Sequence, residues 1–575
     1  AKFGKIFFFL VKIFQQLFFV CDYFLWERKT FFLRQFIEKF FSLYKMWSDF
    51  DVKEVRSCLY VFISVLLLVV LVQWLLKCYN EIKLLPPGPW GIPVMGYLAF
   101  LGQEKHTQYM ELAKKYGGVF SARLGTQLTV VVSDYKVIRD TFRKKEYTGR
   151  PDTPFIQTMD GFGIINSEGK LWRDQRRFLH DKLRQLGVTY MGKGKDVMER
   201  RIMTEVNDYL TTLSTSNGNS IDMSPVLAVA VSNVICNIMM SVRFSLDDPK
   251  FQRFTWLIEE GMRLFGEITT VDYIPTIQYL PGNLTAKNKI AKNRKEMFQF
   301  YREVIDEHKS TFDANNIRDL VDMYLAEIEK ANEEGRSSEL FEGKDHEQQI
   351  MQVIGDLFSA GMETIKTTLL WINVFMLRNR HVMRKVQEEL DLVVGRSRLP
   401  RIEDLPFLPY TESTILEAMR RSSIVPLATT HSPTRDVNLN GYVIPAGAHV
   451  VPLINSVHMD PTLWENPEEF NPNRFINAEG KVQKPEYFMP FGVGRRMCLG
   501  DVLARMELFL FFSSLMHTFD LELPDGEPMP SLKGQVGVTI TPKAFRVCLT
   551  PRPLAVPQVL VSDPVTGTLR NVGSY

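Results

Sequence analysis

The chain has 575 residues, of which 45% are hydrophobic and 23% charged, which is enough apolar material for a large buried core. Its net charge of +3 is too small to indicate nucleic-acid binding. The six cysteines, at positions 21, 58, 78, 236, 498 and 548, form no CxxC pair and no disulfide spacing. This pattern favours a body that folds in a reducing compartment.

Residues 1–45 differ in composition from the rest of the chain. They hold 13 of the 41 phenylalanines, begin with Ala1 and interleave lysines with apolar runs. Two interpretations stay open. The segment is either a second membrane-associating helix or translated upstream sequence, with Met46 as the true start. Nothing in it indicates chemistry.

A membrane anchor is predicted for residues 46–84. Ser57 to Leu76 contains 20 residues without a charge, between Arg56 and Lys77. At ~1.5 Å per residue, such a helix spans ~30 Å, the thickness of the hydrocarbon core of a bilayer. A signal peptide is the alternative, but no small-residue cleavage site follows the run. We place the body on the cytosolic side, where free cysteines persist.

Leu85 to Gly96, with the sequence LPPGPWGIPVMG, is predicted to form a stiff hinge. Its four prolines cannot continue the membrane helix and would hold the body off the bilayer. The body is expected to span residues 97–556, followed by a tail at 557–575.

The body is predicted to be mainly α-helical with a small β region. Residues 107–115 have a helical pattern, Val119 to Val132 alternates as strands do, and helical periodicity dominates to about residue 420. Asn440-Gly441 then predicts a hairpin turn between strands Val437–Leu439 and Tyr442–Ile444. No stretch completes a nicotinamide or flavin motif, so an oxidase built on this chain would need electrons from another protein.

The longest predicted helix runs from Asp345 to Arg378, and the sequence AGMET, Ala360 to Thr364, interrupts its apolar face. A glycine inside a helix costs ~1 kcal/mol, and a threonine hydroxyl can bond back to a carbonyl and bend the helix. A glycine packed at a helix crossing would explain the segment without function. A local groove in the helix is the functional alternative.

Phe491 to Gly500, with the sequence FGVGRRMCLG, carries the strongest chemical signal. Cys498 comes directly before an apolar helical run, at a helix N-terminus that favours a thiolate. A thiolate can be the axial ligand of a haem iron. Gly494 and Gly500 would let the backbone approach a flat macrocycle, and Arg496 could pair with a propionate. The alternative, a buried structural cysteine, does not explain five fixed positions within ten residues.

This decapeptide resembles the cysteine-ligand loop of the cytochrome P-450 superfamily, and further motifs in family order cover about residues 85–555. The resemblance implies the cytochrome P-450 fold with an N-terminal transmembrane helix, and haem b held by Cys498. It also implies use of O₂, with electrons from NADPH through NADPH-cytochrome P-450 reductase, and admits cytochrome b5 as a second donor. The location that it implies is the endoplasmic reticulum membrane, with a cytosolic catalytic body.

Further roles are assigned by the same resemblance. Alone, Trp172 and Arg176 would belong to a basic helix with one buried tryptophan, but they match the family pattern W-x-x-x-R, which donates to a haem propionate. Residues expected to contact the haem are Trp172, Arg176, His431, Arg150, Phe491, Gly494, Arg496 and Gly500. Residues expected to activate oxygen are Ala360, Gly361, Glu363 and Thr364, with Thr364 holding O₂ and water and Glu363 relaying protons.

Glu417 and Arg420 lie one helical turn apart, and an isolated pair of this kind is worth only a few tenths of a kcal/mol. Arg474, in the sequence PNRF, matches the third member of a buried cluster in the family. We expect this cluster to be structural.

Several longer stretches, among them DLFSAGMETIKTTLLWINVFMLRN, resemble the ecdysteroid 26-hydroxylase branch of the family, which inactivates moulting hormone. Apolar residues in the expected pocket walls imply a large lipophilic substrate: Phe155, Phe162, Phe265, Phe358, Val425, Leu427, Val536 and Val538. Three alternatives stay open. These are a xenobiotic oxidase, a hormone-synthesis hydroxylase of the same fold and a haem protein that only binds a gas.

Overall fold

The computed structural model describes residues 84–552, together with residues 60, 63–65, 67–69, 71–73, 560–562 and 569–571. Side chains at 262–263, 265–270, 283–285, 560–562 and 569–571 lie outside the described part. The chain divides into two units, residues 1–84 and 85–575. The second unit contains the body. The extension at 1–45, most of the predicted anchor and most of the tail lie outside the described residues. Within the described part, no helix combines the length and apolar character needed to cross a bilayer.

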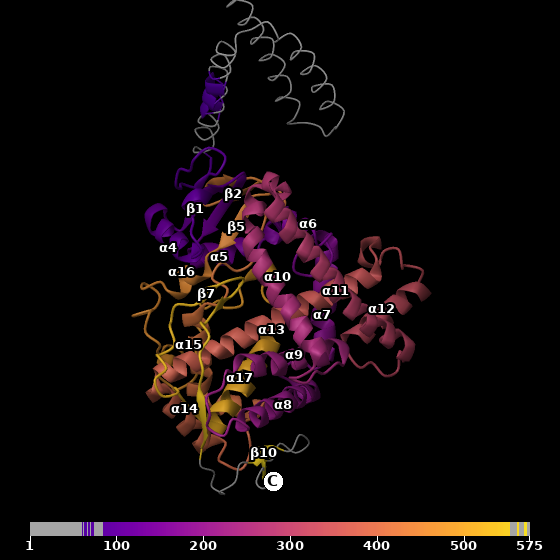
Figure 1. Ribbon diagram of the computed structural model, residues 1–575, viewed down its shortest axis with the longest axis vertical. Coiled ribbons are helices and arrows are strands. Elements are labelled where there is room, and N and C mark those ends of the chain that lie inside the picture. The colour runs from indigo at the N-terminus through magenta and orange to yellow at the C-terminus, as the bar shows by residue number, and fades with distance from the viewer. Residues whose placement is uncertain are drawn as a thin grey trace, which may run out of the picture. The chain divides into compact units, whose positions relative to one another are not determined.

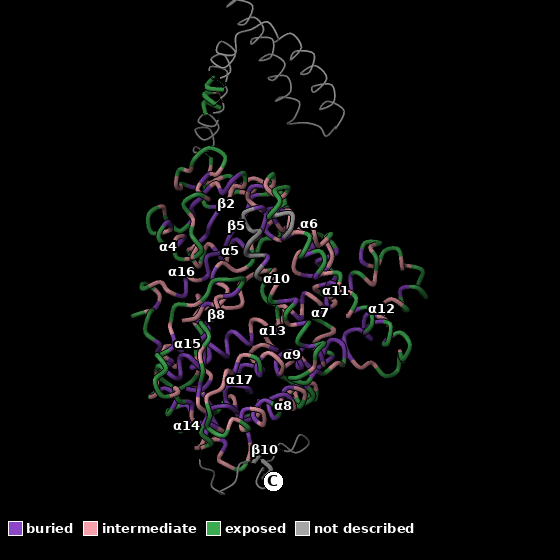
Figure 2. The backbone as a smooth tube through the Cα atoms, viewed as in Figure 1, coloured by how far each residue is buried: buried purple, intermediate pink, exposed green. Residues whose placement is uncertain are grey.

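A long helix, α13 (His346–Arg378), runs through the middle of the body (Figure 1). It begins where the Asp345 carboxylate accepts the Gln348 N–H at 2.7 Å, and it ends at Asn379. Its second half is buried almost throughout, which places it in the core of the body (Figure 2). The helices in contact with it include α9 (Ser224–Met240), α11 (Pro281–Thr311), α15 (Pro409–Ser422) and α17 (Asp501–Thr518).

The remaining helices surround this centre. The α-helices are α4 (Lys105–Tyr116), α5 (Tyr135–Phe142), α6 (Pro154–Gln157), α7 (Gly169–Gln185), α8 (Gly192–Ser214), α10 (Pro249–Tyr273), α12 (Leu320–Glu333), α14 (Arg380–Val393) and α16 (Ile454–His458). The 3-10 helices are η1 (Tyr97–Phe100), η2 (Lys145–Thr148), η3 (Pro275–Tyr279), η4 (Leu340–Gly343), η5 (Ile402–Phe407), η6 (Pro472–Phe475) and η7 (Gly494–Arg496).

One three-stranded sheet lies at one end of the body (Figure 1). Its strands are β1 (Val119–Leu124), β2 (Gln127–Val132) and β5 (His449–Pro452), with β1 and β2 antiparallel and β2 and β5 parallel. The segment predicted as a hinge is bonded to this sheet. The Ser121 N–H donates to the Pro87 carbonyl at 2.9 Å, and the Ser121 hydroxyl donates to the Pro86 carbonyl at 2.6 Å.

The other described strands form antiparallel pairs. They are β3 (Val437–Leu439) with β4 (Tyr442–Ile444), β6 (Phe519–Glu522) with β9 (Cys548–Pro551), β7 (Gln535–Val536) with β8 (Ile540–Thr541), and β10 (Leu560–Ser562) with β11 (Leu569–Asn571). The turn between β3 and β4 has positive φ at both Asn440 and Gly441, as an Asn-Gly hairpin requires.

The predicted mainly helical body with a small β region is confirmed, and the β3–β4 hairpin has the predicted strand limits. The predicted long helix from Asp345 to Arg378 is confirmed as α13, which is continuous through Ala360–Thr364. The Thr364 hydroxyl does bond back to the Ala360 carbonyl, at 2.7 Å, but it does so inside an unbroken helix.

Candidate active site

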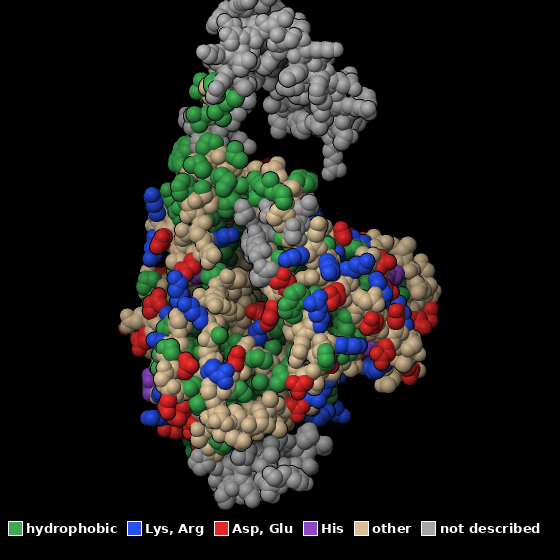
Figure 3. Space-filling model, viewed as in Figure 1, with side chains coloured by type: hydrophobic (Ala, Val, Ile, Leu, Met, Phe, Trp, Pro, Cys, Tyr) green, Lys and Arg blue, Asp and Glu red, His purple; other side chains and the backbone are tan. Residues whose placement is uncertain are grey.

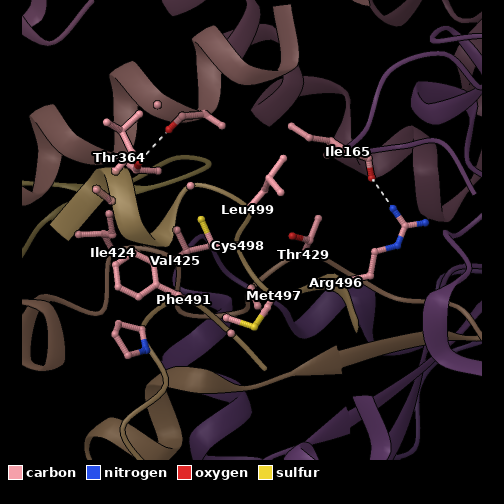
Figure 4. Close-up of a pocket in the computed structure, with 18 of the residues that line it drawn as sticks. Ile165, Thr364, Ile424, Val425, Thr429, Phe491, Arg496, Met497, Cys498 and Leu499 are labelled. Atoms are coloured by element: carbon pink, nitrogen blue, oxygen red, sulfur yellow. Dashed lines mark hydrogen bonds between the residues drawn. The ribbon is translucent and has the colours of Figure 1, made fainter. Parts of the chain in front are cut away.

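A cavity of about 370 Å³ is bounded by α13 on one side and by the loop that precedes α17 on another. Ala360, Gly361 and Thr364 line it from α13, and Cys498 lines it from the loop. In Figure 4, Cys498 lies between Thr364 and Arg496. Residues far apart in the sequence, from 138 to 508, therefore meet around one space.

Cys498 lies between η7 and α17, and its N–H donates to the Phe491 carbonyl at 2.9 Å. Its side chain is exposed to the cavity. Burial within the protein raises the pKa of the thiol, although a backbone hydrogen bond from Gly500 lowers it. The N–H group at the start of α17 thus favours the thiolate, as the sequence argument expected, but burial has the larger effect. A metal ion bound to the sulfur would deprotonate it.

Gly494 allows the loop of residues 491–500, here named the ligand loop, to pack closely against its neighbour α5. This residue has φ of +80°, and a Cβ atom there would lie 2.1 Å from the Phe142 carbonyl oxygen. Gly494 thus lets the loop approach α5, which is a different reason from the expected approach to a macrocycle. Gly500 is the N-cap of α17, lines the cavity and has open space where a Cβ atom would lie. The Phe491 ring also lines the cavity and lies 4.7 Å from the Arg505 guanidinium.

Gly361 both packs against α9 and lines the cavity. A Cβ atom at this position would lie 2.8 Å from Cδ1 of Ile235 on α9. The glycine therefore allows α9 and α13 to pack closely, as the non-functional interpretation expected. Because Gly361 also lines the cavity, the two interpretations are compatible.

The side chain of Glu363 lies in different surroundings from that of Thr364. Its carboxylate accepts hydrogen bonds from the hydroxyls of Thr367, at 3.2 Å, and Thr539, at 3.0 Å. Its second oxygen lies 2.8 Å from the Lys366 ammonium. Thr364 lines the cavity, whereas Glu363 is held by these neighbours outside the cavity lining.

Four basic side chains line one part of the cavity wall: Arg150, Arg176, His431 and Arg496. Burial, and then the Arg150 charge, lower the pKa of Arg496 to about 8. Burial also lowers the pKa of Arg150 to about 10, against the effect of Glu168. Burial and Arg150 lower the pKa of His431 to about 3. Positive charge is therefore in excess here, and an anionic group bound between these side chains would offset it.

Hydrogen bonds fix the orientation of these basic residues. Arg496 donates to the carbonyls of Thr148, at 2.7 Å, and Ser167, at 2.6 Å, and its guanidinium lies 4.0 Å from the Trp172 ring. Arg176 donates to the Met497 carbonyl at 2.7 Å. The predicted pair Trp172 and Arg176 on α7 thus contacts Arg496 and Met497, the two residues that precede Cys498. This donor set fits a flat group with carboxylates at one edge and an iron above Cys498, as haem has.

Glu417, Arg420 and Arg474 come together as a buried cluster outside the cavity lining. Glu417 and Arg420 have no solvent exposure and form a bidentate pair at 2.7 and 2.8 Å. Arg474 donates to Glu417 at 3.3 Å. Arg420 also donates to the His458 carbonyl at 2.7 Å, which ties α15 to the chain that follows α16. These contacts connect separate elements of the fold, as a structural cluster does.

Of the residues predicted to form the substrate pocket, Val425 lines the cavity. Phe358 does not, because it lies on another face of α13, where its ring packs 4.7 Å from that of Phe254. Phe155 borders a separate small cavity of about 20 Å³. Phe162 lies beneath the Lys344 ammonium, at 4.8 Å from its ring centre.

Leu427, Val536 and Val538 also lie off this cavity. Leu427 packs against the cluster that contains Tyr109 and Phe120. Val536 and Val538 are exposed, at 42% and 41% of their surfaces. The side chain of Phe265 lies outside the described part of the chain. The apolar character of a residue does not identify which face of an element meets a cavity. The sequence could therefore not show that these predicted wall residues lie elsewhere.

Asp356 is a site residue that the sequence argument missed. Its buried carboxylate lines the cavity and accepts the N–H groups of Ile164, at 2.8 Å, and Ile165, at 2.9 Å. The Gln352 amide donates to its other oxygen at 2.9 Å. Burial raises the pKa of Asp356. The available signal was an acidic residue on the apolar face of a long helix, a position where an unpaired carboxylate is costly.

Comparison with known proteins adds an independent observation. The family model described as Cytochrome P450 matches residues 86–549. Cytochrome P450 18a1 of Drosophila melanogaster is 70% identical over 521 residues, which cover 91% of this chain and 96% of that protein. Cytochrome P450 2U1 of Rattus norvegicus is 33% identical over 84% of this chain and 94% of its own length. Human Cytochrome P450 2D6 is 35% identical over 81% of this chain and 93% of its own length.

Proposed function

Because the chain belongs to the cytochrome P450 family of haem-dependent monooxygenases, we propose that it hydroxylates ecdysteroids at carbon 26 and so inactivates moulting hormone. The observation that carries the reaction type is the cavity in which Cys498 faces the Ala360–Thr364 segment of α13. The substrate assignment is supported by the resemblance of long stretches, α13 among them, to the ecdysteroid 26-hydroxylase branch.

In this proposal Cys498 would bind the haem iron, and the basic side chains Arg150, Arg176, His431 and Arg496 would pair with the haem propionates. Haem held by a thiolate supplies the cleavage of the O–O bond of O₂ with electrons from a reductase. The protein contributes the charge of the basic side chains, which balances the propionates, and the stacking of Trp172 on Arg496.

Thr364 is placed to hold a water molecule or an oxygen atom at its hydroxyl. That hydroxyl donates to the Ala360 carbonyl at 2.7 Å, so its lone pairs are free to accept from a group in the cavity. Glu363, the next residue, would take up protons from solvent and return them towards Thr364. Each turnover consumes two protons from solvent with two electrons, and both residues end it in their starting state.

The cavity wall suits a lipophilic side chain close to Cys498. Ile235, Ile238 and Met239 contribute apolar surface from α9, and Ile424 and Val425 contribute it from the loop after α15. The terminal carbons of a sterol side chain have stronger C–H bonds than the ring carbons. Selection of carbon 26 must therefore come from positioning, which can supply several kcal/mol. An alcohol that stays bound in the same position can be oxidised in two further turnovers, first to an aldehyde and then to a carboxylic acid.

Turnover of ecdysone and 20-hydroxyecdysone by the protein with its reductase, followed by mass spectrometry of the products, tests the proposal. We expect the 26-hydroxy product first and the acid later. Ala360→Phe should abolish both products while the thiolate spectrum of the carbon monoxide complex is kept. Ring-hydroxylated products alone, or turnover of other lipophiles but of no ecdysteroid, would favour the xenobiotic or hormone-synthesis alternative.

For electron delivery, we propose that an acidic reductase that carries electrons from NADPH docks on the basic surface near Cys498, and that cytochrome b5 can share it. Arg173, Arg177 and Arg495 are exposed and Lys182 is partly exposed on this side of α7 and the ligand loop. The rate at which oppositely charged proteins associate falls as the salt concentration rises, because salt screens their attraction. Arg177→Glu should slow reduction of the iron at low salt without changing substrate affinity. Equal reduction rates across a salt series would argue against this surface.

We also propose that the body rests on the endoplasmic reticulum membrane through an apolar patch. Hydrophobic side chains gather at the end of the body that carries β1 and β2 (Figure 3). The exposed members include Trp90, Val94, Tyr279 and Leu280. The turn between β1 and β2 links the segments that carry these residues. Its Gly125 N–H donates to the Met95 carbonyl, and its Thr126 N–H donates to the Tyr273 carbonyl, both at 2.9 Å. Quenching of Trp90 fluorescence by brominated lipids, lost in Trp90→Phe, would support this contact.

A further inference from the structure

The Glu363 carboxylate is held by a residue 176 positions away in the chain, Thr539. Thr539 is buried, at 5% exposure, and lies in the turn between β7 and β8. Its hydroxyl donates to Glu363 at 3.0 Å. A hydrogen bond to an ionised acceptor is about twice as strong as one between neutral groups. The bond therefore ties the relay carboxylate to a separate element of the fold.

The β7–β8 hairpin is itself fixed on two sides. The Ile540 N–H donates at 2.8 Å to the carbonyl of Ile424, a residue of the cavity wall. The Trp371 indole N–H donates to the Ile540 carbonyl, also at 2.8 Å. Both bonds are made by Ile540, the residue after Thr539, so the Thr539 hydroxyl has a defined place relative to α13.

Lys366 completes the surroundings of Glu363. Its side chain is only 9% exposed, and its ammonium lies 2.8 Å from Glu363 and 4.0 Å from Glu259 on α10. The Glu259 side chain is 64% exposed. The charged side chains of Glu259, Lys366 and Glu363 thus form a series of ion pairs from the surface to the residue before Thr364.

We propose that Thr539 and Lys366 are positioning residues that fix Glu363 at the solvent side of the cavity wall, so that it can pass protons to Thr364. The proposal rests on the relay role of Glu363 in the proposed function. Glu363 takes one proton from solvent for each proton it releases, so no charge accumulates. Loss of either contact frees the carboxylate to leave the single orientation in which Thr539 and Lys366 hold it.

A double-mutant cycle on the resting, haem-loaded protein tests the contact without turnover. Thr539→Val, Glu363→Ala and the double variant are unfolded thermally. If the two side chains interact, the shifts in Tm are not additive, because the second change removes a partner already lost. Thr541→Val is the matched control on the same hairpin, where Thr541 pairs with Gln535. Its shift should add to that of Glu363→Ala. Additive shifts for Thr539→Val would overturn the contact.

The positioning role is tested by the coupling of NADPH use to product. Thr539→Val should lower product formed per NADPH by about tenfold and raise the solvent isotope effect, as misplacement of a proton-transfer group does. Thr539→Ser, which keeps the hydroxyl, should restore both. Turnover driven by hydrogen peroxide, which brings its own protons with the oxygen, should fall much less. An equal loss in both modes would mean that Thr539 only shapes the substrate site.

Lys366→Met provides a second variant if Thr539→Val does not fold. It should raise peroxide release per NADPH with any lipophile that is turned over. Unchanged release and an unchanged isotope effect would overturn the proposal for Lys366. Because these measurements do not depend on ecdysteroid products, failure of the substrate assignment and failure of the positioning role are separate results.

Discussion

Replacement of Asp356 tests how the cavity wall is held together. Asp356→Ala removes the acceptor of two backbone N–H groups, of Ile164 and Ile165, and of the Gln352 amide. A buried donor left without a partner costs about 1–3 kcal/mol, so the two backbone groups together cost roughly 2–6 kcal/mol. Relief of the buried charge offsets part of this loss. We expect a net loss of roughly 2–4 kcal/mol in the free energy of unfolding.

Asp356→Asn is the matched control. Both backbone N–H groups donate to the same oxygen, Oδ2, so an asparagine carbonyl in that place can accept both. Its cost should be about 1 kcal/mol or less, mainly from the Gln352 contact. Chemical denaturation of the haem-loaded protein, followed by circular dichroism and by the Soret band, measures both changes. The reasoning is refuted if Asp356→Ala is as stable as the parent, or if Asp356→Asn costs as much as Asp356→Ala.

The sign of the pH dependence gives a further check on Asp356. Burial raises its pKa above the unfolded value, so the folded protein binds this proton more tightly than the unfolded chain does. Its contribution to stability is present below the unfolded pKa and is lost as pH rises through the folded pKa. The parent should therefore lose stability relative to Asp356→Asn as the pH rises through this window.

The remaining predictions concern the iron ligand, oxygen activation and a second carboxylate. Cys498→Ser should abolish the red-shifted Soret band of the reduced carbon monoxide complex, and retention of that band would exclude Cys498 as the ligand. Thr364→Ala should keep haem content and substrate affinity but lower product per NADPH, whereas unchanged coupling would contradict its role. Burial raises the pKa of Asp272 from 3.8 to about 6, so its contribution to stability is present below the unfolded pKa and is lost as pH rises through about 6. Relative to Asp272→Asn, the parent should lose at most about 3 kcal/mol across this window in unfolding measurements, and a flat difference would refute the shift.

Local signals in the sequence predicted the elements of the fold well. The Asn440-Gly441 turn fixes its hairpin because both residues accept positive φ, and an apolar run without prolines is enough to place α13. Cys498 and the basic residues of the cavity wall could be named because a known family has the same spacing. In each of these cases the informative residues lie close together in the sequence.

Features that depend on long-range packing were not predictable in the same way. Glu363 follows Met362 by one residue and precedes Thr364 by one, but a helix turns about 100° per residue, so neighbours meet different surroundings. The partner of Glu363, Thr539, and the partners of Asp356, at 164 and 165, are known only once the chain has folded. The same cause explains why Phe358 packs into the core while Ala360 lines the cavity.

The β7–β8 hairpin also bears on how related proteins can diverge. Its exposed valines, 536 and 538, can change without breaking a bond to α13. The adjoining pair, Thr539 and Ile540, is bonded to α13 and to the cavity wall at once. Mutational drift should therefore concentrate on the first pair, while the second pair changes only together with its partners. A library of variants of this hairpin should therefore accept changes at 536 and 538 and reject most changes at 539 and 540.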